Sequence, residues 1–426
     1  MEAVTRPPLT YHEALAWLYS LQRFGIKLGL ENIKRLLDEL SRRGDLQVTL
    51  GDSEAAIPWK VIHIAGTNGK GSVCAMIDSI CRAQGYRTGL FTSPHLVTFR
   101  ERIRVNGDPI SEDAVAHGLT TIRNLVATWD PHPTFFEVVT ALAIKHFSDA
   151  KVEIVVLETG LGGRLDATNA IPSNVSVITP IDFDHEKWLG KTLSEIAAEK
   201  AGIIKPGVPV VSASQRPDAE KEIRARATEC NAPLQFVTNL YDATPIALAG
   251  SHQKENAALA VAALRAVKID VDDSAIARGL ESIDWPARFQ RWDERTIIDG
   301  AHNPAAARML AETWREMFGA QRATLILAIL SDKNLCEICE ALVPITDSVV
   351  LPKIQSQRAS DPGELANVLA KIRPALPHSI TSSIGKALDL ARSRPHPILI
   401  TGSLHFAGEV LAYLRGEPAA FEECTQ

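Results

Sequence analysis

The chain has 426 residues, of which 46% are hydrophobic and 23% are charged. This is a globular composition, and the length predicts two or three domains. The formal net charge of −6 argues against a general nucleic-acid-binding surface, and no apolar run reaches the length of a membrane span. The N-terminal residues lack a basic start followed by an apolar block, so we expect no secretory signal and no membrane partner.

The six cysteines are sparse and fall mostly within helical patterns, which favours reduced thiols and a cytoplasmic protein. Cys336 and Cys339 form a CxxC pair. We interpret them as two thiols one turn apart on a helix, because no further metal ligands are evident near them in the sequence.

In chain order, short apolar runs alternate with helical patterns. Strands are predicted at residues 61–66, 87–91, 152–158, 174–179 and 208–213. Helical patterns run from the glycines after the first strand to about residue 83, and then over residues 111–128, 134–148, 195–205 and 251–267. Short buried strands that alternate with helices predict a parallel sheet.

A second α/β series begins near residue 290. Its predicted elements are a helix over residues 303–318 and strands at residues 295–299, 323–330, 348–352 and 397–401. Proline and charges at 282–294 mark the best boundary between the two series. We expect an N-terminal P-loop-type parallel-sheet ATPase domain over residues 1–287 and a smaller C-terminal Rossmann-like α/β domain over residues 288–426. Ligands of such folds bind in the cleft beyond the carboxyl ends of the strands.

The stretch HIAGTNGKGS (63–72) joins the first strand to a helix through three glycines. A strand, a glycine turn and a helix N-terminus form an anion site, because backbone N–H groups and the helix dipole favour negative charge. Lys70 can reach terminal phosphates, and Ser72 can offer a hydroxyl to phosphate or Mg²⁺. The match to GxxxxGK[ST] is imperfect, since Ile64 and Gly71 replace its first glycine and its final hydroxyl. An ordinary glycine-rich turn is the alternative.

Polar residues end two of the predicted strands. Glu158 closes the strand at 152–158, where it is either a ligand at the functional edge of the sheet or a strand-end residue bonded to loop amides. After the strand at 174–179, an oxygen-rich cluster suited to Mg²⁺ contains Asp182, Asp184, His185 and Glu186. Histidine is a less usual Mg²⁺ ligand, and some of the acids must simply be solvated.

A series of motifs in one order carries a resemblance to a known family. The motifs are RFGIKLGLENI (23–33), GTNGKGS (66–72), GLFTSPHLVTFRERIRVNG (89–107), TFFEVVTALA (134–143), LETGLGGRLDATN (157–169), DFDHEKWLGKTL (182–193), AEKAGIIKPG (198–207), PARFQ (286–290) and DGAHNP (299–304). Together they resemble the Mur ligase family, in the branch that contains folylpolyglutamate synthase and dihydrofolate synthase. The likeness extends over nearly the whole chain.

The resemblance implies that ATP contacts the glycine loop and the second domain. The implied contacts are Thr67, Asn68, Gly69, Lys70, Gly71, Ser72, Asn256, Arg288 and Asp299. Judged from the residues alone, Asn256 is an exposed polar residue on a helix, and Arg288 is either a donor to phosphate oxygens or an interdomain salt-bridge partner.

The resemblance also implies two Mg²⁺ ions, with ligands at Ser93, Glu158 and His185. The sequence pattern around Lys200 predicts a solvated lysine on a charged helix face, but the resemblance implies a carbamylated lysine at this motif. Carbamylation requires a neutral amine, so nearby cations must lower the pKa of Lys200. We interpret His95, which lies close to the loop serine, as structural.

The implied substrates are dihydropteroate or a reduced folate, together with L-glutamate. The implied contacts of the pterin substrate are Thr134, Phe135, Phe136, Glu137, Leu165, Asp166 and Ala167. A core role for one of the two phenylalanines is an equal alternative. The implied catalytic residues are Lys70, Lys200 and His302, with His302 facing the reaction centre. A purely structural role of His302 in the turn after the strand is the alternative. Ser403 and His405 are assigned to seating the amino acid.

The chemistry fits these parts. A carboxylate is a poor acyl donor, and transfer of the ATP γ-phosphoryl group to it supplies phosphate as a leaving group that an amine can displace. The resemblance therefore implies an ATP-dependent ligase that makes an amide through an acyl phosphate and releases ADP and phosphate. A cell-wall Mur ligase, a nucleotide-binding regulatory module and a phosphotransferase are the alternatives. We expect a monomer.

Overall fold

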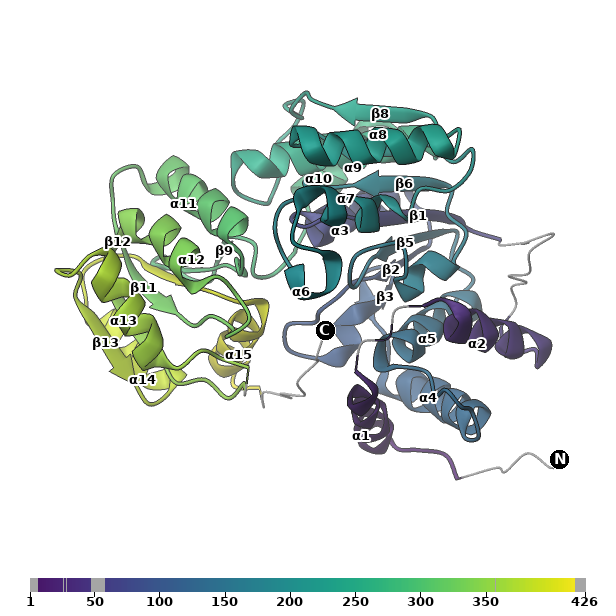
Figure 1. Ribbon diagram of the computed structural model, residues 1–426, viewed down its shortest axis with the longest axis horizontal. Helices are drawn as coiled ribbons and strands as arrows, with labels where there is room; N and C mark the ends of the chain where they lie inside the picture. The colour runs from purple at the N-terminus through teal and green to yellow at the C-terminus, as the bar shows by residue number, and fades with distance from the viewer. Residues whose placement is uncertain (1–6, 26, 28, 47–57, 357, 418–426) are drawn as a thin grey trace.

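The computed structural model describes residues 7–25, 27, 29–46, 58–356 and 358–417. Cys424 and two positions of the 23–33 motif, residues 26 and 28, lie outside the described residues. The described chain forms two lobes that lie side by side, each built around its own sheet (Figure 1). The N-terminal lobe is purple to teal in the figure, and the C-terminal lobe is green to yellow.

The sheet of the N-terminal lobe is mostly parallel, as predicted. Its strands lie in the order β4 (Asp108–Pro109), β3 (Ile103–Val105), β2 (Thr88–Phe91), β5 (Ile154–Glu158), β1 (Lys60–Ala65), β6 (Val175–Ile178), β7 (Val210–Ala213) and β8 (Leu234–Val237). Only the β2–β3 and β3–β4 pairs of this sheet are antiparallel within the described residues. The five strands predicted for this region are confirmed, whereas β3, β4 and β8, at the two ends of the sheet, were not predicted because they are short and partly or fully exposed.

Helices cover both faces of this sheet. One face packs against α3 (Lys70–Gln84), α9 (Ser251–Ala266) and α10 (Asp273–Glu281). The other face packs against α1 (Tyr11–Ser20), α2 (Glu31–Arg42), α4 (Glu112–Val126), α5 (Phe135–Asp149), α7 (Leu193–Ala201) and α8 (Pro217–Glu229). Successive side chains of a strand point to opposite faces, so Ile62 enters the first core and Val61 the second. Strands buried on both faces therefore read as continuous apolar runs.

The C-terminal lobe repeats this layering around a smaller sheet. Its strands lie in the order β13 (His378–Thr381), β12 (Thr346–Pro352), β11 (Ala323–Leu327), β14 (Ile398–Thr401), β10 (Thr296–Ile298) and β9 (Gln290–Arg291), parallel except for β9. One face packs against α11 (Pro304–Phe318), α12 (Leu335–Leu342) and α13 (Pro362–Ile372), and the other against α14 (Ile384–Arg392) and α15 (Leu404–Arg415). The half-exposed β13 was not predicted, and β11 is shorter than the predicted strand at 323–330.

Short helices complete the connections between these elements. They are α6 (Glu186–Leu189) and the 3₁₀ turns η1 (Leu21–Phe24), η2 (Phe99–Arg102), η3 (Ala167–Ala170) and η4 (Val343–Ile345). Cys336 and Cys339 both lie on α12, one exposed and one buried, and the described cysteines are free thiols, as interpreted from the sequence. None of the helices in the described ranges is long and apolar enough to cross a membrane.

Candidate active site

The glycine loop between β1 and α3 wraps around the first turn of α3. Gly66 has φ +146°, and a Cβ atom there would lie 1.9 Å from the Oγ1 atom of Thr179, so only glycine fits. Gly69, with φ +89°, is the residue that precedes the helix. Lys70 Nζ donates to the carbonyl oxygens of Gly66 at 3.1 Å and Thr67 at 3.2 Å, so its ammonium folds back over the loop. The loop thus combines a helix N-terminus with a cation, which makes an anion site.

A cavity between the two lobes opens beside this loop. Every residue expected to contact ATP lines it, namely Thr67, Asn68, Gly69, Lys70, Gly71, Ser72, Asn256, Arg288 and Asp299. The expected metal ligands and the remaining expected catalytic and amino-acid-seating residues line the same cavity, namely Ser93, Glu158, His185, Lys200, His302, Ser403 and His405. Segments far apart in the sequence therefore meet at the carboxyl ends of the strands of both sheets.

Ser93 and Glu158 form an oxygen-rich corner of the cavity. The Ser93 backbone N–H donates to Glu158 Oε2 at 3.0 Å, whereas the buried Ser93 hydroxyl has no hydrogen-bond partner. Burial raises the pKa of Glu158, and the nearby Lys70 ammonium opposes this rise. A buried hydroxyl that lacks a partner beside a carboxylate suits a hard cation such as Mg²⁺.

His185 also lines the cavity, and it directly precedes α6 with φ +52°. Burial lowers its pKa to about 3, so the ring is neutral and free to ligate a metal. Among the described residues, no three His, Cys, Asp or Glu side chains converge closely enough to hold a metal. A cation on Glu158 or His185 would thus take most of its ligands from Ser93, water and phosphate oxygens, as Mg²⁺ in nucleotide sites does.

Lys200 on α7 is buried rather than solvated, in contrast to the reading from its sequence pattern alone. Its Nζ donates to the Gly66 carbonyl oxygen at 2.8 Å, which places the amine beneath the glycine loop. Burial, followed by the charge of Lys70, lowers the pKa of Lys200 to about 7. A large share of this amine is therefore unprotonated at neutral pH, and the main cause is loss of water rather than neighbouring cations.

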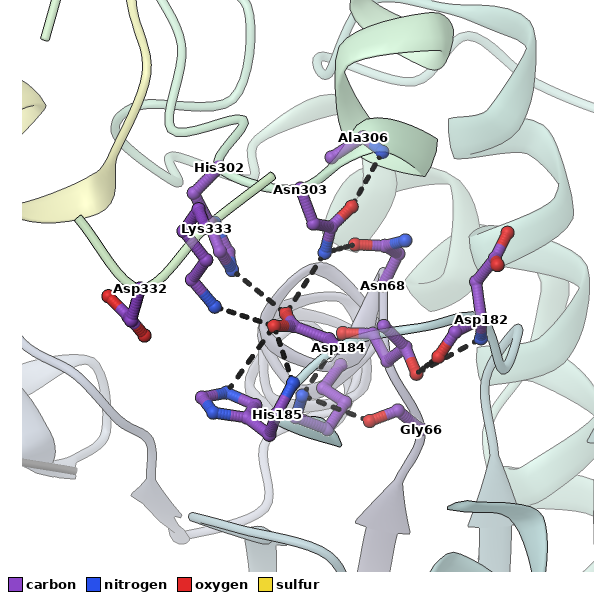
Figure 2. A network of polar contacts seen from close by, with 12 residues as sticks. Gly66, Asn68, Asp182, Asp184, His185, His302, Asn303, Ala306, Asp332 and Lys333 are labelled. Atoms are coloured by element: carbon purple, nitrogen blue, oxygen red, sulfur yellow. Dashed lines mark hydrogen bonds and ion pairs between the residues drawn. The ribbon is translucent and has the colours of Figure 1, made fainter. Parts of the chain in front are cut away.

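Asp184 joins the two lobes at this cavity (Figure 2). Its carboxylate accepts from Lys333 Nζ at 2.5 Å and Asn303 Nδ2 at 3.1 Å, and it lies 3.6 Å from His302 Nε2. Burial alone would raise the pKa of Asp184, but the contact with His302 and the charge of Lys333 hold it well below its ordinary value. Asn303 also donates to Asn68 Oδ1 at 3.1 Å, so the C-terminal lobe docks directly on the glycine loop.

Other expected ATP contacts also organise the backbone around the cavity. Asp299 accepts from the Phe289 N–H at 2.7 Å and the Ala301 N–H at 2.8 Å, which holds the turn after β10. Asn256 donates to Gln253 Oε1 at 2.9 Å, and it is buried rather than exposed. These side chains fix the walls of the cavity in addition to lining it.

The C-terminal lobe supplies the remaining expected residues. Ser403 caps α15 by accepting from the Phe406 N–H at 3.0 Å, and Asn303 caps α11 in the same way through the Ala306 N–H at 2.8 Å. His302 Nδ1 lies 2.9 Å from the Gly300 carbonyl oxygen, which holds the turn after β10, and His302 also lines the cavity. Burial lowers the pKa of His405 to about 4.

A second cavity holds all of the residues expected to contact the pterin substrate. It is lined by Thr134, Phe135, Phe136, Glu137, Leu165, Asp166 and Ala167, together with Gln22, Gly25, Lys27 and Gly29 from the N-terminal segment, which sequence reasoning missed. Gly160 and Leu161 line this cavity and the first one, so the two are adjacent. Thr134 and Glu137 also form the capping box of α5.

The two phenylalanines of this cavity differ in environment. Phe135 is buried in the core of the N-terminal lobe, with its ring 5.4 Å from that of Tyr19. Phe136 is only partly buried, and a Cβ atom at Gly160 would lie 2.4 Å from its ring. Phe135 therefore takes the core role foreseen for one of the pair, and Phe136 borders the wall shared by the two cavities.

Sequence reasoning missed Lys333, which lines the first cavity, and Gln253, which holds Asn256. Lys333 follows the strand predicted at 323–330, and a lysine just beyond a strand end was the available signal. His95 accepts a hydrogen bond from the buried Arg102 Nε at 2.9 Å, in keeping with its interpretation as structural.

Comparisons with known proteins agree over nearly the whole chain. Residues 64–207 match the Mur ligase middle domain, and residues 283–413 match the dihydrofolate synthetase C-terminal domain. The chain is 34% identical to dihydrofolate synthase/folylpolyglutamate synthase of Bacillus subtilis, over 95% of this chain and 99% of that protein.

Solved structures give the same result. E. coli FolC in complex with DHPP and ADP superposes with a TM-score of 0.82 and 31% identity, covering 97% of this chain and 99% of that one. The bifunctional enzyme of Yersinia pestis, complexed with AMPPNP and a Mn ion, superposes with a TM-score of 0.82 and 30% identity, covering 97% and 100%. The fold, the cavity and these likenesses agree: the chain belongs to the dihydrofolate synthase/folylpolyglutamate synthase family of ATP-dependent ligases.

Proposed function

We propose that this protein joins L-glutamate to dihydropteroate, to the γ-carboxylate of a reduced folate, or to both, with ATP as the phosphoryl donor. The observation that carries the proposal is that Gly160 and Leu161 form a wall shared by the first cavity, beside the glycine loop, and the second cavity. An acid whose ring lies in the second cavity extends its carboxylate past this wall toward the glycine loop. That arrangement brings a carboxylate to the terminal phosphate, as acyl-phosphate formation requires.

The glycine loop and the C-terminal lobe would hold ATP between them. Backbone N–H groups of residues 69–72 and the Lys70 ammonium would face the phosphates, and Arg288 offers a planar donor from the opposite lobe. Asn256 and Asp299 also line this cavity, and we assign them to contacts with the nucleoside. The arrangement lets charge that develops on the transferred phosphoryl group meet fixed donors from both lobes.

Ser93, Glu158 and His185 are the proposed metal ligands. The unpartnered Ser93 hydroxyl and the neutral His185 ring fit this role, and a relative was crystallised with a Mn ion. Mg²⁺ held there would neutralise phosphate charge and polarise the transferred phosphoryl group. Two Mg²⁺ ions remain the prediction from the family resemblance.

Lys200 is the proposed site of carbamylation. Its burial and its pKa of about 7 supply the neutral amine that reaction with CO₂ requires. A carbamate would replace a buried cation by an anionic oxygen group near the phosphate loop, which favours a neighbouring Mg²⁺.

L-Glutamate would bind at the C-terminal side of the first cavity. His302, Ser403, His405 and Lys333 line this side, and these side chains can donate hydrogen bonds to an amino acid with two carboxylates. An amine placed there faces the acyl phosphate from the side opposite the glycine loop. We assign His302 to orienting the incoming amine.

We also propose the domain boundary at residues 287/288 and a cytoplasmic, monomeric protein. The second sheet begins with β9 at Gln290, and the match to the C-terminal family domain begins at residue 283, which supports a boundary in this segment. The free thiols of the described cysteines suit a reducing compartment.

The direct test is a substrate panel with purified protein, ATP and Mg²⁺. Dihydropteroate with L-glutamate should yield dihydrofolate, and tetrahydrofolate with L-glutamate should yield a longer glutamate chain if both activities are present. ADP release that is independent of L-glutamate and leaves a stable phosphorylated acid would contradict the ligase assignment and indicate a phosphotransferase. Lys70→Ala should abolish product formation without loss of the fold.

A further inference from the structure

A buried chain of hydrogen bonds connects the central strand of the N-terminal sheet to the second cavity. His63 on β1 is fully buried, and its Nε2 lies 2.8 Å from Thr168 Oγ1. The Thr168 hydroxyl donates to Asp166 Oδ1 at 2.5 Å. Thr168 lies on η3 and Asp166 caps this turn, so the series of hydrogen bonds runs from the core to Asp166, which lines the second cavity.

The direction of each hydrogen bond is fixed by chemistry. Asp166 also accepts from the N–H groups of Gly160 at 2.9 Å, Leu161 at 2.8 Å and Thr168 at 3.1 Å, none of which can accept in return. The carboxylate is therefore an acceptor throughout, and the single hydroxyl proton of Thr168 points to it. Thr168 Oγ1 is left to accept from His63, so the His63 proton lies on Nε2.

The remaining surroundings of His63 support this assignment. Its Nδ1 is buried and has no hydrogen-bond partner among the described residues. Burial lowers the pKa of His63 to about 3, so the ring is neutral and has one N–H to place. Placing that N–H on Nδ1 would leave a buried donor unpaired, which costs more than the unpaired lone pair that the observed arrangement leaves.

Through Asp166, this chain fixes the wall shared by the two cavities. Gly160 and Leu161 are the two residues common to both, and their N–H groups are held by Asp166 Oδ2. Lys205 holds η3 from its other side by donating to the Asn169 carbonyl and side-chain oxygens. The position of the wall thus depends on how Asp166 is oriented.

We propose that His63 and Thr168 are positioning residues for the pterin acid, which act by orienting Asp166 and, through it, Gly160 and Leu161. The inference rests on the proposed function, because it takes the second cavity to be the pterin site. Neither His63 nor Thr168 is among the described residues that line the second cavity. Their loss should therefore weaken pterin-acid binding while leaving the ATP site intact.

The test compares Thr168→Val, which removes the hydroxyl at constant shape, with Thr168→Ser, which keeps it. Thr168→Val should raise the KM for dihydropteroate about tenfold, the change expected for loss of one hydrogen bond to a charged group. His63→Phe, which removes a hydrogen bond to a neutral hydroxyl, should raise this KM about fivefold. Their KM for ATP should stay within about twofold of the parent value. Thr168→Ser should behave like the parent protein.

Thr140→Val is the matched control, because the buried Thr140 hydroxyl on α5 has no hydrogen-bond partner. It should leave both KM values unchanged. A folded Thr168→Val protein with the parent KM for dihydropteroate would overturn the inference. An equal rise in both KM values would do the same, since it would indicate a general structural defect.

Two further measurements separate the possible failures. In ¹⁵N NMR of the parent protein the His63 proton should lie on Nε2, and finding it on Nδ1 would overturn the inference even if the variants do not fold. Asp166→Asn should raise the KM for dihydropteroate as well. If it does not, the second cavity is not the pterin site, and the proposed location of the substrate fails together with the inference drawn from it.

Discussion

Lys333 and Asp184 form a buried ion pair across the two lobes, with Nζ 2.5 Å from the carboxylate oxygen. Their side chains are only 8% and 7% exposed, so solvent screens the pair weakly. Asp184 precedes the expected metal ligand His185, and Lys333 follows β11 of the opposite lobe. The pair therefore holds the C-terminal lobe against the N-terminal lobe at the first cavity, next to the expected metal ligand.

Lys333→Met should destabilise the protein by about 3 kcal/mol, because Asp184 would keep a buried charge without its closest partner. Urea unfolding followed by circular dichroism measures this change. Lys386→Met, which alters an exposed lysine on α14, is the control and should have little effect. Equal stability of the two variants would show that the interlobe pair contributes nothing to docking.

Ser93→Ala should raise the Mg²⁺ concentration for half-maximal activity about tenfold, because the variant lacks one expected oxygen ligand. Its melting temperature should stay unchanged, since the Ser93 hydroxyl makes no hydrogen bond in the protein. Ser173→Ala removes another buried hydroxyl without a partner and should change neither quantity. An unaltered Mg²⁺ titration for Ser93→Ala would remove this residue from the metal site.

Carbamylation of Lys200 can be observed directly by ¹³C NMR after incubation with ¹³C-labelled bicarbonate. The parent protein should show a carbamate signal that Lys200→Arg lacks, and Lys200→Ala should lose activity by about a hundredfold. Lys205→Arg is the control, because Lys205 is a second lysine with a lowered pKa, about 8, outside the phosphate cavity. Loss of the signal in Lys205→Arg rather than Lys200→Arg would place the modification elsewhere.

The pKa of Lys200 also predicts a pH dependence of stability. The folded protein releases this proton near pH 7, whereas the unfolded chain holds it up to the ordinary value of 10.5. The unfolded state therefore binds more protons between these values, and the contribution of Lys200 to stability rises with pH across that window.

In CO₂-free buffer, the free energy of unfolding of the parent protein relative to Lys200→Met should increase from pH 7 to pH 10. Subtracting the variant removes the contributions of other titrating groups that the two proteins share. A difference that stays constant over this range would mean that the amine remains protonated in the folded state.

The contrast between Phe135 and Phe136 separates core packing from substrate binding. Phe135→Ala should cost about 3–5 kcal/mol of stability, because it removes a buried ring from the core. Phe136→Ala should cost less, because its ring is only partly buried, and should raise the KM for dihydropteroate while sparing that for ATP. Unfolding curves and steady-state kinetics of both variants check this, and the reverse order of effects would contradict the placement of the pterin.

Much of the fold could be read from the sequence because its signals are local. Apolar runs such as residues 152–158 predicted the buried strands, and the glycines before Lys70 predicted a turn into a helix. The two layered lobes followed from the alternation of these runs with helical patterns. The resemblance to a ligase family then named residues whose grouping in two adjacent cavities the structure provides.

Other features depended on contacts between residues far apart in the chain. The pattern around Lys200 indicated a solvated lysine, but the fold buries this amine beneath the glycine loop and thereby lowers its pKa. Lys333 meets Asp184 from 149 residues away, and His63 meets Thr168 from 105 residues away. The sequence alone determined where the chain forms its buried strands, its glycine turn and the helices predicted beside them, because these depend on the period and chemistry of neighbouring residues. The tertiary structure alone decided which charges lose their water and which polar groups pair, because both depend on packing between distant segments.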